Sequence, residues 1–517
     1  MLDATPLLRL YARARLRRLA DRRPAAVQED QLLRLVRRAE ATRFGRDHGF
    51  AGIRSVRDFR ERVPLRRYED FRRDYWSDGF PVLTDATWPG TIPYFAATSG
   101  TTTGTTKYIP VSRAMVRANT RAAFDLLVFH AANRPGSRVM GGRNFMLGGS
   151  TALVEEAPGI FSGDLSGIAT REVPRWVRRY TFPPPDLALL SDWEQKVDRI
   201  GRRSLDEDIR TLGGTTSWLL LYLDRLADLF PDRPPTLAGF YPNLELLVHG
   251  GVSFEPYAAR FTRWLEGGRA ELREVYPASE GFLAVADRGQ GEGLRLLLDN
   301  GLFFEFVPPE ELDAPNPRRF WVHDAEPGVN YAVVLSTCAG AWSYVLGDTV
   351  RLVDRDPPRV LVTGRTSYTL SAFGEHLIGE EIERAVSDAA AAIGAAISDY
   401  SVGPVFPEAP GERGGHVFVV EWAGGVPPPP ALDAFAQALD GRLAALNDDY
   451  AAHRAGGFGM APPRLEPAAP GTFAAWMRSR GKLGGQNKVP RIINDRSLLG
   501  SLRRAAAQRR GDPVPGA

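Results

Sequence analysis

Five short apolar runs between residues 302 and 363 restrict the fold of this chain more than any other pattern in it. They are separated by Gly, Asp and Pro, which favour turns, so each run is predicted to be a strand. The predicted strands are 302–307, 332–335, 342–345, 349–353 and 360–363. A sixth run, 244–248, is apolar except for Glu245 and ends beside a glycine pair, which indicates a largely buried strand.

Helical patterns lie on both sides of these strands. Residues 1–75 carry apolar side chains at helical spacing until Pro64 interrupts them, and a further helix is predicted at 113–132. In the last part of the chain we predict a helix at 378–393, a strand at 416–422 and a helix at 431–446. This last part begins after Arg365 and, at about 150 residues, has the size of an independent α+β domain.

The first helix has a pattern of its own. Seven arginines precede Pro24, as they would in a transit peptide or a surface-binding helix. A loose helical stripe runs through Leu8, Tyr11, Leu16 and Leu19. The stripe favours a helix that docks onto the core.

The charge of the chain is close to balanced. Its 517 residues include 65 Lys and Arg against 62 Asp and Glu, a net charge of +3, so we expect no nucleic-acid partner. All but four of the basic residues are arginines, and the lysines are Lys107, Lys196, Lys482 and Lys488. Because arginine serves elsewhere, a lysine is expected where a compact ammonium group is needed.

The composition also restricts the compartment. A single cysteine, Cys338, excludes an intrachain disulfide and a cysteine-cluster metal site, and we expect it to be a small buried residue. No run approaches the ~18 apolar residues of a membrane-spanning helix, and the N-terminus lacks the apolar segment of a signal peptide. We predict a cytoplasmic protein with no membrane partner.

The segment most informative about function is the loop from Ala97 to Lys107, with the sequence ATSGTTTGTTK. Glycine lets backbone N–H groups approach a ligand, hydroxyls and amides donate hydrogen bonds, and the terminal lysine adds a positive charge. The loop therefore predicts a cradle for an anion rather than an ordinary surface loop.

This loop differs from the common nucleotide-binding motifs. A Walker-type P-loop needs glycine where this chain has Thr105, and Ser or Thr where it has Tyr108. The chain also lacks the G-x-G-x-x-G and G-x-S-x-G patterns, and its seven histidines form no ligand-spaced cluster. The sequence thus argues against dinucleotide-binding, serine-hydrolase and histidine-metal sites.

The loop resembles the phosphate-binding motif of adenylate-forming enzymes. Its extra residue before Gly104 makes it more similar to the Gretchen Hagen-type acyl acid amido synthetases than to acyl-CoA ligases. The resemblance covers nearly the whole chain, and its motifs keep their order and spacing. These motifs are 42–45 (TRFG), 58–68 (DFRERVPLRRY), 276–282 (YPASEGF), 344–348 (YVLGD), 470–473 (PGTF) and 486–491 (QNKVPR).

The resemblance implies an architecture and a reaction. The architecture is α/β, with a large N-terminal adenylate-forming domain at 1–365, made of α/β subdomains and a β-barrel-like part, and a smaller mobile α+β domain at 366–517. In the reaction a carboxylic acid and ATP give an acyl-adenylate and pyrophosphate, and an amino acid or another amine then takes the acyl group. Positive charge and amide donors would reduce the repulsion between carboxylate and phosphate.

The resemblance also assigns catalytic roles. Lys107 would neutralise charge on the leaving pyrophosphate, and Lys488 would reach the α-phosphate or the acyl oxygen during adenylation. Glu280 would help to hold Mg²⁺, a cation that prefers carboxylate and phosphate oxygens. Without the resemblance, Glu280 would be taken for a solvated carboxylate at a helix start.

The other implied contacts bind the nucleotide. The loop residues that would cradle the phosphates are Ser99, Gly100, Thr101 and Thr103. Tyr276 would flank the adenine, Ser279 would lie near the α-phosphate, and Asp348 would accept hydrogen bonds from both ribose hydroxyls. Further contacts are implied at Gly251, Val252, Ala278 and, beside a domain hinge, Arg365.

Some features of the sequence leave the function open. Val345 stands where the family usually has an arginine. The acyl pocket would lie in poorly matched regions, 113–130 and 212–222, whose apolar and aromatic residues favour a hydrophobic or aromatic acid. One alternative passes the acyl group to coenzyme A or another acceptor, which the loop spacing disfavours. Another is a degenerate nucleotide-binding regulatory protein, which the retention of both lysines and both carboxylates disfavours.

Overall fold

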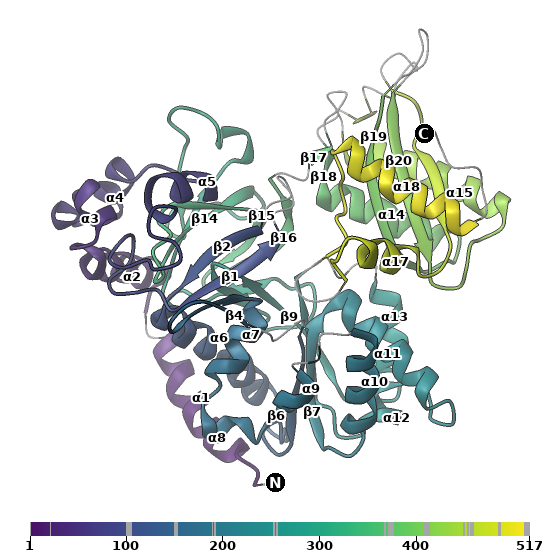
Figure 1. Cartoon of the computed structure of the whole chain (residues 1–517), viewed down its shortest axis with the longest axis horizontal. Coiled ribbons are helices and arrows are strands. Elements are labelled where there is room, and N and C mark those ends of the chain that lie inside the picture. The colour runs from purple at the N-terminus through teal and green to yellow at the C-terminus, as the bar shows by residue number, and fades with distance from the viewer. Residues whose placement is uncertain are drawn as a thin grey trace. The chain divides into compact units, whose positions relative to one another are not determined.

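The structure is a computed structural model, and it forms two compact units (Figure 1). The first unit contains Met1–Gly251 and Leu265–Val362, and the second contains Val252–Trp264 and Thr363–Ala517. The described residues are 2–20, 22–99, 106–148, 153–188, 190, 193–251, 254, 257–366, 369–370, 377–406, 414–447, 450–451, 454, 460–483 and 488–510.

Helices form the N-terminal part of the first unit, as the apolar spacing predicted. α4 (Val56–Arg62) begins at Ser55, whose hydroxyl accepts a hydrogen bond from the Asp58 backbone N–H at 3.1 Å. The other helices of this part are α1 (Thr5–Ala20), α2 (Pro24–Ala39), α3 (Arg43–Asp47) and α5 (Tyr68–Phe71). They are followed by α6 (Arg113–Asn133), which confirms the helix predicted at 113–132.

A buried tryptophan joins these helices to the strands. Trp342 is fully buried, and its ring centroid lies 4.8 Å from Phe50 and 6.1 Å from Phe44. Its indole N–H donates a hydrogen bond to the Thr87 carbonyl at 2.9 Å. Aromatic rings bury large apolar areas, so this cluster fixes the N-terminal helices on the sheet.

One large sheet extends through the first unit. Its strand order is β13-β12-β14-β15-β16-β11-β10-β9-β8-β7-β3-β6. The strands β6, β3, β7, β8 and β9 are parallel neighbours, and the pairs from β9 to β12 that the structure describes are antiparallel. The bounds are β3 (Arg143–Leu147), β6 (Thr181–Phe182), β7 (Ile209–Thr215), β8 (Leu246–Gly250), β9 (Glu271–Ala278), β10 (Gly281–Val285), β11 (Leu294–Leu296), β12 (Leu302–Val307), β13 (Phe320–Trp321), β14 (Asn330–Thr337), β15 (Tyr344–Arg355) and β16 (Pro358–Arg365).

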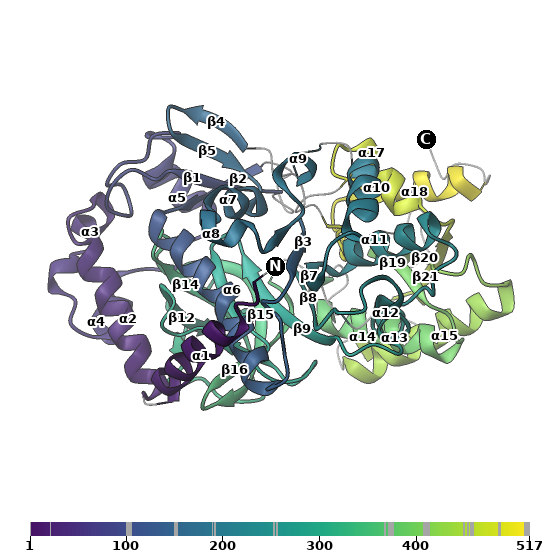
Figure 2. The same cartoon turned by 90° about the horizontal axis from the view of Figure 1, so that it is seen from below.

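Helices connect the parallel strands of this sheet. They are α7 (Leu165–Glu172), α8 (Arg175–Arg178), α9 (Pro185–Ala188), α10 (Trp193–Ser204), α11 (Thr216–Leu229) and α12 (Leu237–Phe240), and α13 (Ala258–Leu265) follows β8. Figures 1 and 2 both show α10 and α11 packed side by side. This alternation of strand and helix is the α/β pattern that the sequence predicted.

The predicted strands are confirmed with one correction. Two separate strands were predicted at 342–345 and 349–353, but 344–345 and 349–353 lie in the single strand β15, and residues 342 and 343 precede it. Gly347 adopts φ 90°, a left-handed conformation that favours glycine, and the strand continues past it through an irregular stretch. The glycine signalled a bulge rather than a strand end.

A smaller sheet of the first unit has the strand order β2-β1-β5-β4. Its members are β1 (Tyr94–Ser99), β2 (Thr106–Val111), β4 (Leu153–Ala157) and β5 (Ile160–Gly163). β1 and β2 form an antiparallel pair in which Ser99 stands opposite Thr106. The loop predicted to bind an anion therefore joins two paired strands.

The second unit contains a three-stranded sheet covered by helices on both faces. Its strands are β19 (Ile397–Val405), β20 (Gly415–Trp422) and β21 (Arg464–Ala468), and two short strands are β17 (Thr369–Leu370) and β18 (Leu377–Ile378). Side chains of β20 alternate: Phe418 and Val420 pack with α14 (Gly379–Ala392) and α15 (Pro429–Leu446), whereas Val417 and Val419 pack with α17 (Thr472–Ser479) and α18 (Arg496–Arg510). The predicted helix, strand and helix of this unit are confirmed.

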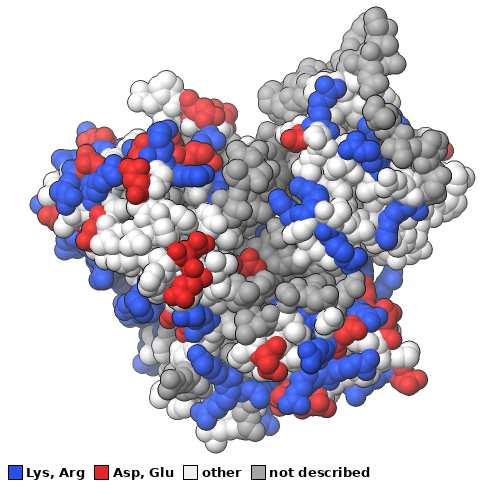
Figure 3. Space-filling view, in the orientation of Figure 1, with Lys and Arg blue, Asp and Glu red and all other residues white. Residues whose placement is uncertain are grey.

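The structure also bears on the expectations drawn from the composition, which concern the cysteine, membrane-spanning helices and the charge. Cys338 is buried, and burial raises the pKa of its thiol to about 12. Among the helices of the described residues, none is both long and apolar enough to cross a membrane. On the face shown in Figure 3, basic and acidic side chains are interspersed, in keeping with the near-balanced charge.

Candidate active site

The predicted anion loop is closed by the last pair of the β1–β2 ladder. Ser99 is the final residue of β1, and Lys107 is the second residue of β2, opposite Thr98. Gly100, Thr101 and Thr103, as well as the side chain of Ser99, lie outside the described residues. The structure thus places Lys107 on a strand at the base of the loop.

Lys107 is held by the first turn of α5. Its Nζ lies 3.3 Å from Glu69 Oε1 and 5.2 Å from the ring centroid of Tyr68. The Tyr68 hydroxyl accepts a hydrogen bond from the Tyr108 backbone N–H at 3.0 Å, which ties α5 to β2. Because Glu69 is 55% exposed, the ion pair contributes about 1 kcal/mol or less. A phosphate oxygen could replace this carboxylate at low cost.

Glu69 was missed by the sequence analysis. It follows directly after the quoted motif that ends at Tyr68, and its separation from Lys107 along the chain hid the contact.

Of the other lysines, Lys196 is buried and its Nζ donates to the Ala188 carbonyl at 2.9 Å. Burial lowers its pKa. That lysine stabilises the α9–α10 connection.

A second group of predicted residues lies where the parallel strands β8 and β9 end. Gly250 pairs with Val275, and the next residues along the chain are Gly251 and Tyr276. A Cβ at Gly250 would lie 2.2 Å from the Val275 carbonyl oxygen, so only glycine fits there. Carboxyl ends of parallel strands are the usual ligand-binding edge of α/β sheets. Val252 lies outside the described residues.

The turn from β9 to β10 carries Ser279 and Glu280. Ala278 pairs with Gly281, which leaves these two residues as the whole connection between the strands. A Cβ at Gly281 would lie 2.9 Å from a methyl group of Leu302, so the turn packs closely on β12. Glu280 therefore stands in a tight strand–strand turn, and a helix start, the alternative considered from sequence, is wrong.

Tyr276 and Asp348 are in direct contact. The Tyr276 hydroxyl donates a hydrogen bond to Asp348 Oδ2 at 2.7 Å, although the two residues are 72 positions apart. Asp348 follows Gly347 in the irregular part of β15, where Val333 of β14 stands opposite three residues, 346–348. Because of this bulge, Asp348 occupies a position that it would not have in a regular strand.

Next to this strand edge lies a group of buried and half-buried polar side chains that the sequence analysis did not assign. His249 pairs with Glu274 across β8 and β9, and His249 Nε2 lies 2.9 Å from Gln290 Oε1. Burial lowers the pKa of His249 to about 4, and burial raises the pKa of Glu274 to about 7. Near neutral pH His249 is therefore uncharged, whereas Glu274 is protonated in only part of the molecules. No sequence motif pointed to Glu274 or Gln290.

The remaining predicted residues belong to the end of β16 and to the second unit. Arg365 is the last residue of β16, and its side chain lies outside the described residues. Lys488 belongs to the second unit, three residues before Arg491. Arg491 forms an ion pair with Asp399 and donates a hydrogen bond to the Tyr257 hydroxyl, which anchors this segment.

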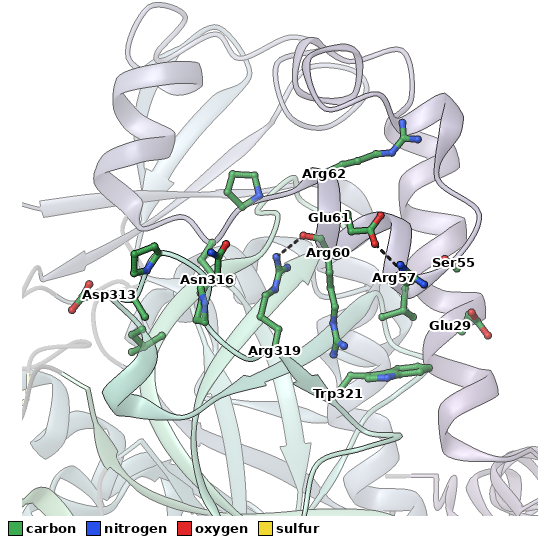
Figure 4. Close-up of a pocket in the computed structure, with 17 residues that line it drawn as sticks. Glu29, Ser55, Arg57, Arg60, Glu61, Arg62, Asp313, Asn316, Arg319 and Trp321 are labelled. Atoms are coloured by element: carbon green, nitrogen blue, oxygen red, sulfur yellow. Dashed lines mark hydrogen bonds and ion pairs between the residues drawn. The ribbon is translucent and has the colours of Figure 1, made fainter.

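A pocket of about 860 Å³ lies elsewhere in the first unit, between α4 and the residues before β13 (Figure 4). None of the predicted site residues lines it. Its arginines already have partners: Arg319 binds Glu305 at 2.9 Å, and Arg57 binds Glu61 at 2.8 Å. We assign no chemistry to this pocket. Among the described residues, no three His, Cys, Asp or Glu side chains gather as a metal site of their own.

Three segments of the chain match domains of one protein family. The GH3 family N-terminal domain matches residues 15–147, the GH3 family central domain matches 295–365, and the GH3 family C-terminal domain matches 380–497. These segments include the predicted residues Ser99, Lys107, Asp348 and Lys488.

Plant proteins are among the relatives in sequence. The probable indole-3-acetic acid-amido synthetase GH3.2 of Oryza sativa subsp. japonica is 28% identical over 283 residues, which cover 49% of this chain and 45% of the relative. The indole-3-acetic acid-amido synthetase GH3.3 of Arabidopsis thaliana is 24% identical over 274 residues, which cover 49% and 44%. The aligned parts span about half the length of these relatives.

Solved structures confirm the fold. The AtGH3.15 acyl acid amido synthetase in complex with 2,4-DB superposes with a TM-score of 0.79 at 18% identity, over 95% of each chain. The 2-hydroxyisobutyryl-CoA ligase in the postadenylation state superposes with a TM-score of 0.59 at 17% identity, over 93% of this chain and 91% of the ligase. The α/β fold with a large N-terminal part and a smaller C-terminal part is thus as predicted.

Proposed function

Because the chain belongs to the GH3 family, we propose that it is an ATP-dependent acyl acid amido synthetase. In the first step a carboxylate oxygen attacks the α-phosphorus of ATP, the bond to pyrophosphate breaks, and an acyl-adenylate forms. In the second step an amino acid or another amine attacks the acyl carbon, and AMP leaves as the amide forms. The names of the plant relatives support this reaction class.

The contact between Tyr276 and Asp348 carries the proposal. Adenine and ribose are joined in one nucleoside, so a residue that flanks the adenine must lie near one that binds the ribose hydroxyls. The 2.7 Å hydrogen bond between these two side chains meets that requirement. Gly251 follows the last residue of β8, whose partner Val275 directly precedes Tyr276, and a glycine there has no side chain to obstruct a flat base.

The phosphate end of the site is proposed to lie at the β1–β2 hairpin. Lys107 would exchange its exposed partner Glu69 for a phosphate oxygen, and the loop residues Ser99, Gly100, Thr101 and Thr103 would supply hydroxyl and amide donors. Lys488 would act in adenylation as part of a mobile C-terminal domain. These roles, and those of Ala278, Ser279, Val252 and Arg365, rest on the family resemblance.

Mg²⁺ fits the residues available in the β9–β10 turn. A Mg²⁺ ion is commonly bound by one or two carboxylates together with substrate phosphates, so a single glutamate at a turn is sufficient. Glu280 would hold the ion and, through it, the phosphates of ATP. The ion would neutralise charge that develops on pyrophosphate.

The substrates are proposed by class. A hydrophobic or aromatic carboxylic acid suits the apolar and aromatic side chains of α6 and α11, although most of these also serve the core. The acceptor is an amino acid or another amine. We propose that the reaction takes place in the cytoplasm and involves no nucleic acid, given the near-balanced charge.

Exchange of labelled pyrophosphate into ATP tests the first step. A panel of aromatic and aliphatic carboxylic acids should include acids that stimulate the exchange, and chelation of Mg²⁺ should abolish it. If no acid stimulates exchange, the chain is a nucleotide-binding protein without turnover and the proposal is wrong. With the best acid, mass spectrometry of products formed with amino acids or with coenzyme A identifies the acceptor; a thioester without an amide would contradict the second step.

A further inference from the structure

The outer face of α1 exposes apolar side chains that the fold does not use. Leu2, Leu7 and Leu10 are 74%, 70% and 67% exposed, the three largest values among the large apolar side chains of the described residues. Tyr11 on the same helix is also exposed. Isolated exposed leucines are ordinary, but a cluster of the most exposed ones marks a contact surface.

The geometry of α1 explains why it carries two apolar faces. Leu8 and Ala12 pack against Val128 and Ala131 of α6, which confirms that the helix docks onto the core. Tyr11, which the sequence analysis placed on that docking stripe, is 45% exposed, so that assignment was wrong. At about 100° per residue, four of the exposed residues share one arc of the helix. They are Leu7, Leu10, Tyr11 and Ala14.

This helix is held firmly in place. Arg15 is buried and binds Asp125 at 2.7 Å and Asp299 at 2.5 Å, while Arg9 donates to the Ser137 carbonyl at 2.6 Å. Figures 1 and 2 show α1, in dark purple, at the periphery of the first unit. The outer face is therefore presented on a fixed helix rather than on a loose end.

All charged side chains of α1 are arginines, so the charges that this helix places near the exposed leucines are positive. Arg13, Arg17 and Arg18 are exposed, and α1 contains no acidic residue. A second copy of the chain that docked through the same face would bring two arginine-bearing surfaces together, and their like charges repel. The positive charge instead complements a negative surface.

We propose that the outer face of α1 together with the preceding Leu2, a surface defined as Leu2, Leu7, Leu10, Tyr11, Arg13, Arg17 and Arg18, binds the surface of an anionic lipid bilayer. A helix that exposes leucines together with arginines can lie in the bilayer interface, and tyrosine suits the headgroup level. A single convex helix has no groove for a partner peptide, whereas a bilayer adapts to it. This differs from the prediction of no membrane partner, which rested on the lack of a membrane-spanning run and of a signal peptide.

Vesicle flotation with the full-length chain tests the proposal. The chain should float with vesicles of phosphatidylcholine mixed with phosphatidylserine and remain behind with phosphatidylcholine alone, and high salt should weaken the binding. Leu10→Asp should reduce binding by about tenfold or more, because a charge would enter the apolar layer. The matched control Val426→Asp changes an exposed apolar residue of the second unit and should bind like the unmodified chain.

A second pair of variants tests the charge. Replacing Arg13, Arg17 and Arg18 by Gln should abolish the preference for anionic vesicles, whereas replacing Arg34, Arg37 and Arg38 of α2 by Gln should preserve it at the same net charge. Equal loss in both triple variants would overturn the proposal. So would absence of flotation with either vesicle, or a dimer in solution that Leu10→Asp converts to a monomer. Pyrophosphate exchange should be unchanged in every variant, which separates this proposal from the proposed enzymatic function.

Discussion

The two ends of the proposed nucleotide site are built in different ways. At the nucleoside end, strand register, close-packed glycines and the Tyr276–Asp348 hydrogen bond fix the side chains before a ligand arrives. At the phosphate end, Lys107 rests on the exposed carboxylate of Glu69. The nucleoside end is therefore preorganised, whereas the phosphate end must exchange one anionic partner for another.

Removal of the ammonium at the phosphate end should have the largest effect. Lys107→Ala should reduce acid-dependent pyrophosphate exchange by about a hundredfold or more, because developing charge on pyrophosphate loses its main protein cation. Lys482→Ala, which removes a lysine outside the motifs, is the matched control and should retain activity. Circular dichroism should show both variants folded. Exchange at the unmodified rate in Lys107→Ala would place the phosphates elsewhere.

At the nucleoside end, Asp348→Asn should raise the KM for ATP by about tenfold, because an amide cannot accept from both ribose hydroxyls as a carboxylate does. Tyr276→Phe should raise it less, about threefold, because it removes one neutral donor that positions the carboxylate. The preference for ATP over 2′-deoxy-ATP should shrink in both. If the preference is unchanged in Asp348→Asn, that residue does not bind the ribose.

Glu69→Gln should have a smaller effect of opposite sign. Without the competing carboxylate, Lys107 is free to bind phosphate, so the KM for ATP should fall about two- to fivefold. Glu61→Gln removes an exposed glutamate that pairs with Arg57 and serves as the control. A rise in KM for Glu69→Gln would show that Glu69 positions the lysine instead of competing for it.

Glu274→Gln should change stability rather than activity. Burial raises the pKa of Glu274 to about 7 from its ordinary 4.5, so its contribution is present below pH 4.5 and is lost as the pH rises through 7. The unmodified protein should lose up to roughly 3 kcal/mol relative to the variant across that window. Urea unfolding at several pH values measures the difference. A difference that does not depend on pH would mean that Glu274 is not held protonated by burial.

The sequence predicted the elements of the site better than their contacts. The strand at 302–307 was predicted with the bounds of β12, because a buried apolar run between turn residues has few other structures available. The pairing of Tyr276 with Asp348 was not predictable from spacing, because it depends on which strands become neighbours and on the bulge at Gly347. Glu69 escaped notice for the same reason. The roles of both nucleoside residues came from resemblance alone.

The β9–β10 turn has a consequence for how this region can evolve. Because Ala278 pairs with Gly281, the connection has no spare length, and inserting one residue into β10 would move each following side chain to the opposite face of the sheet. Leu283 and Val285 are fully buried, and after such an insertion residues next to them in sequence, with side chains of other shapes, would occupy their positions. Substitutions at Ser279 and Glu280 change chemistry, but insertions and deletions there should disrupt the sheet itself. Natural variation in this segment should therefore alter the two side chains and leave the number of residues constant.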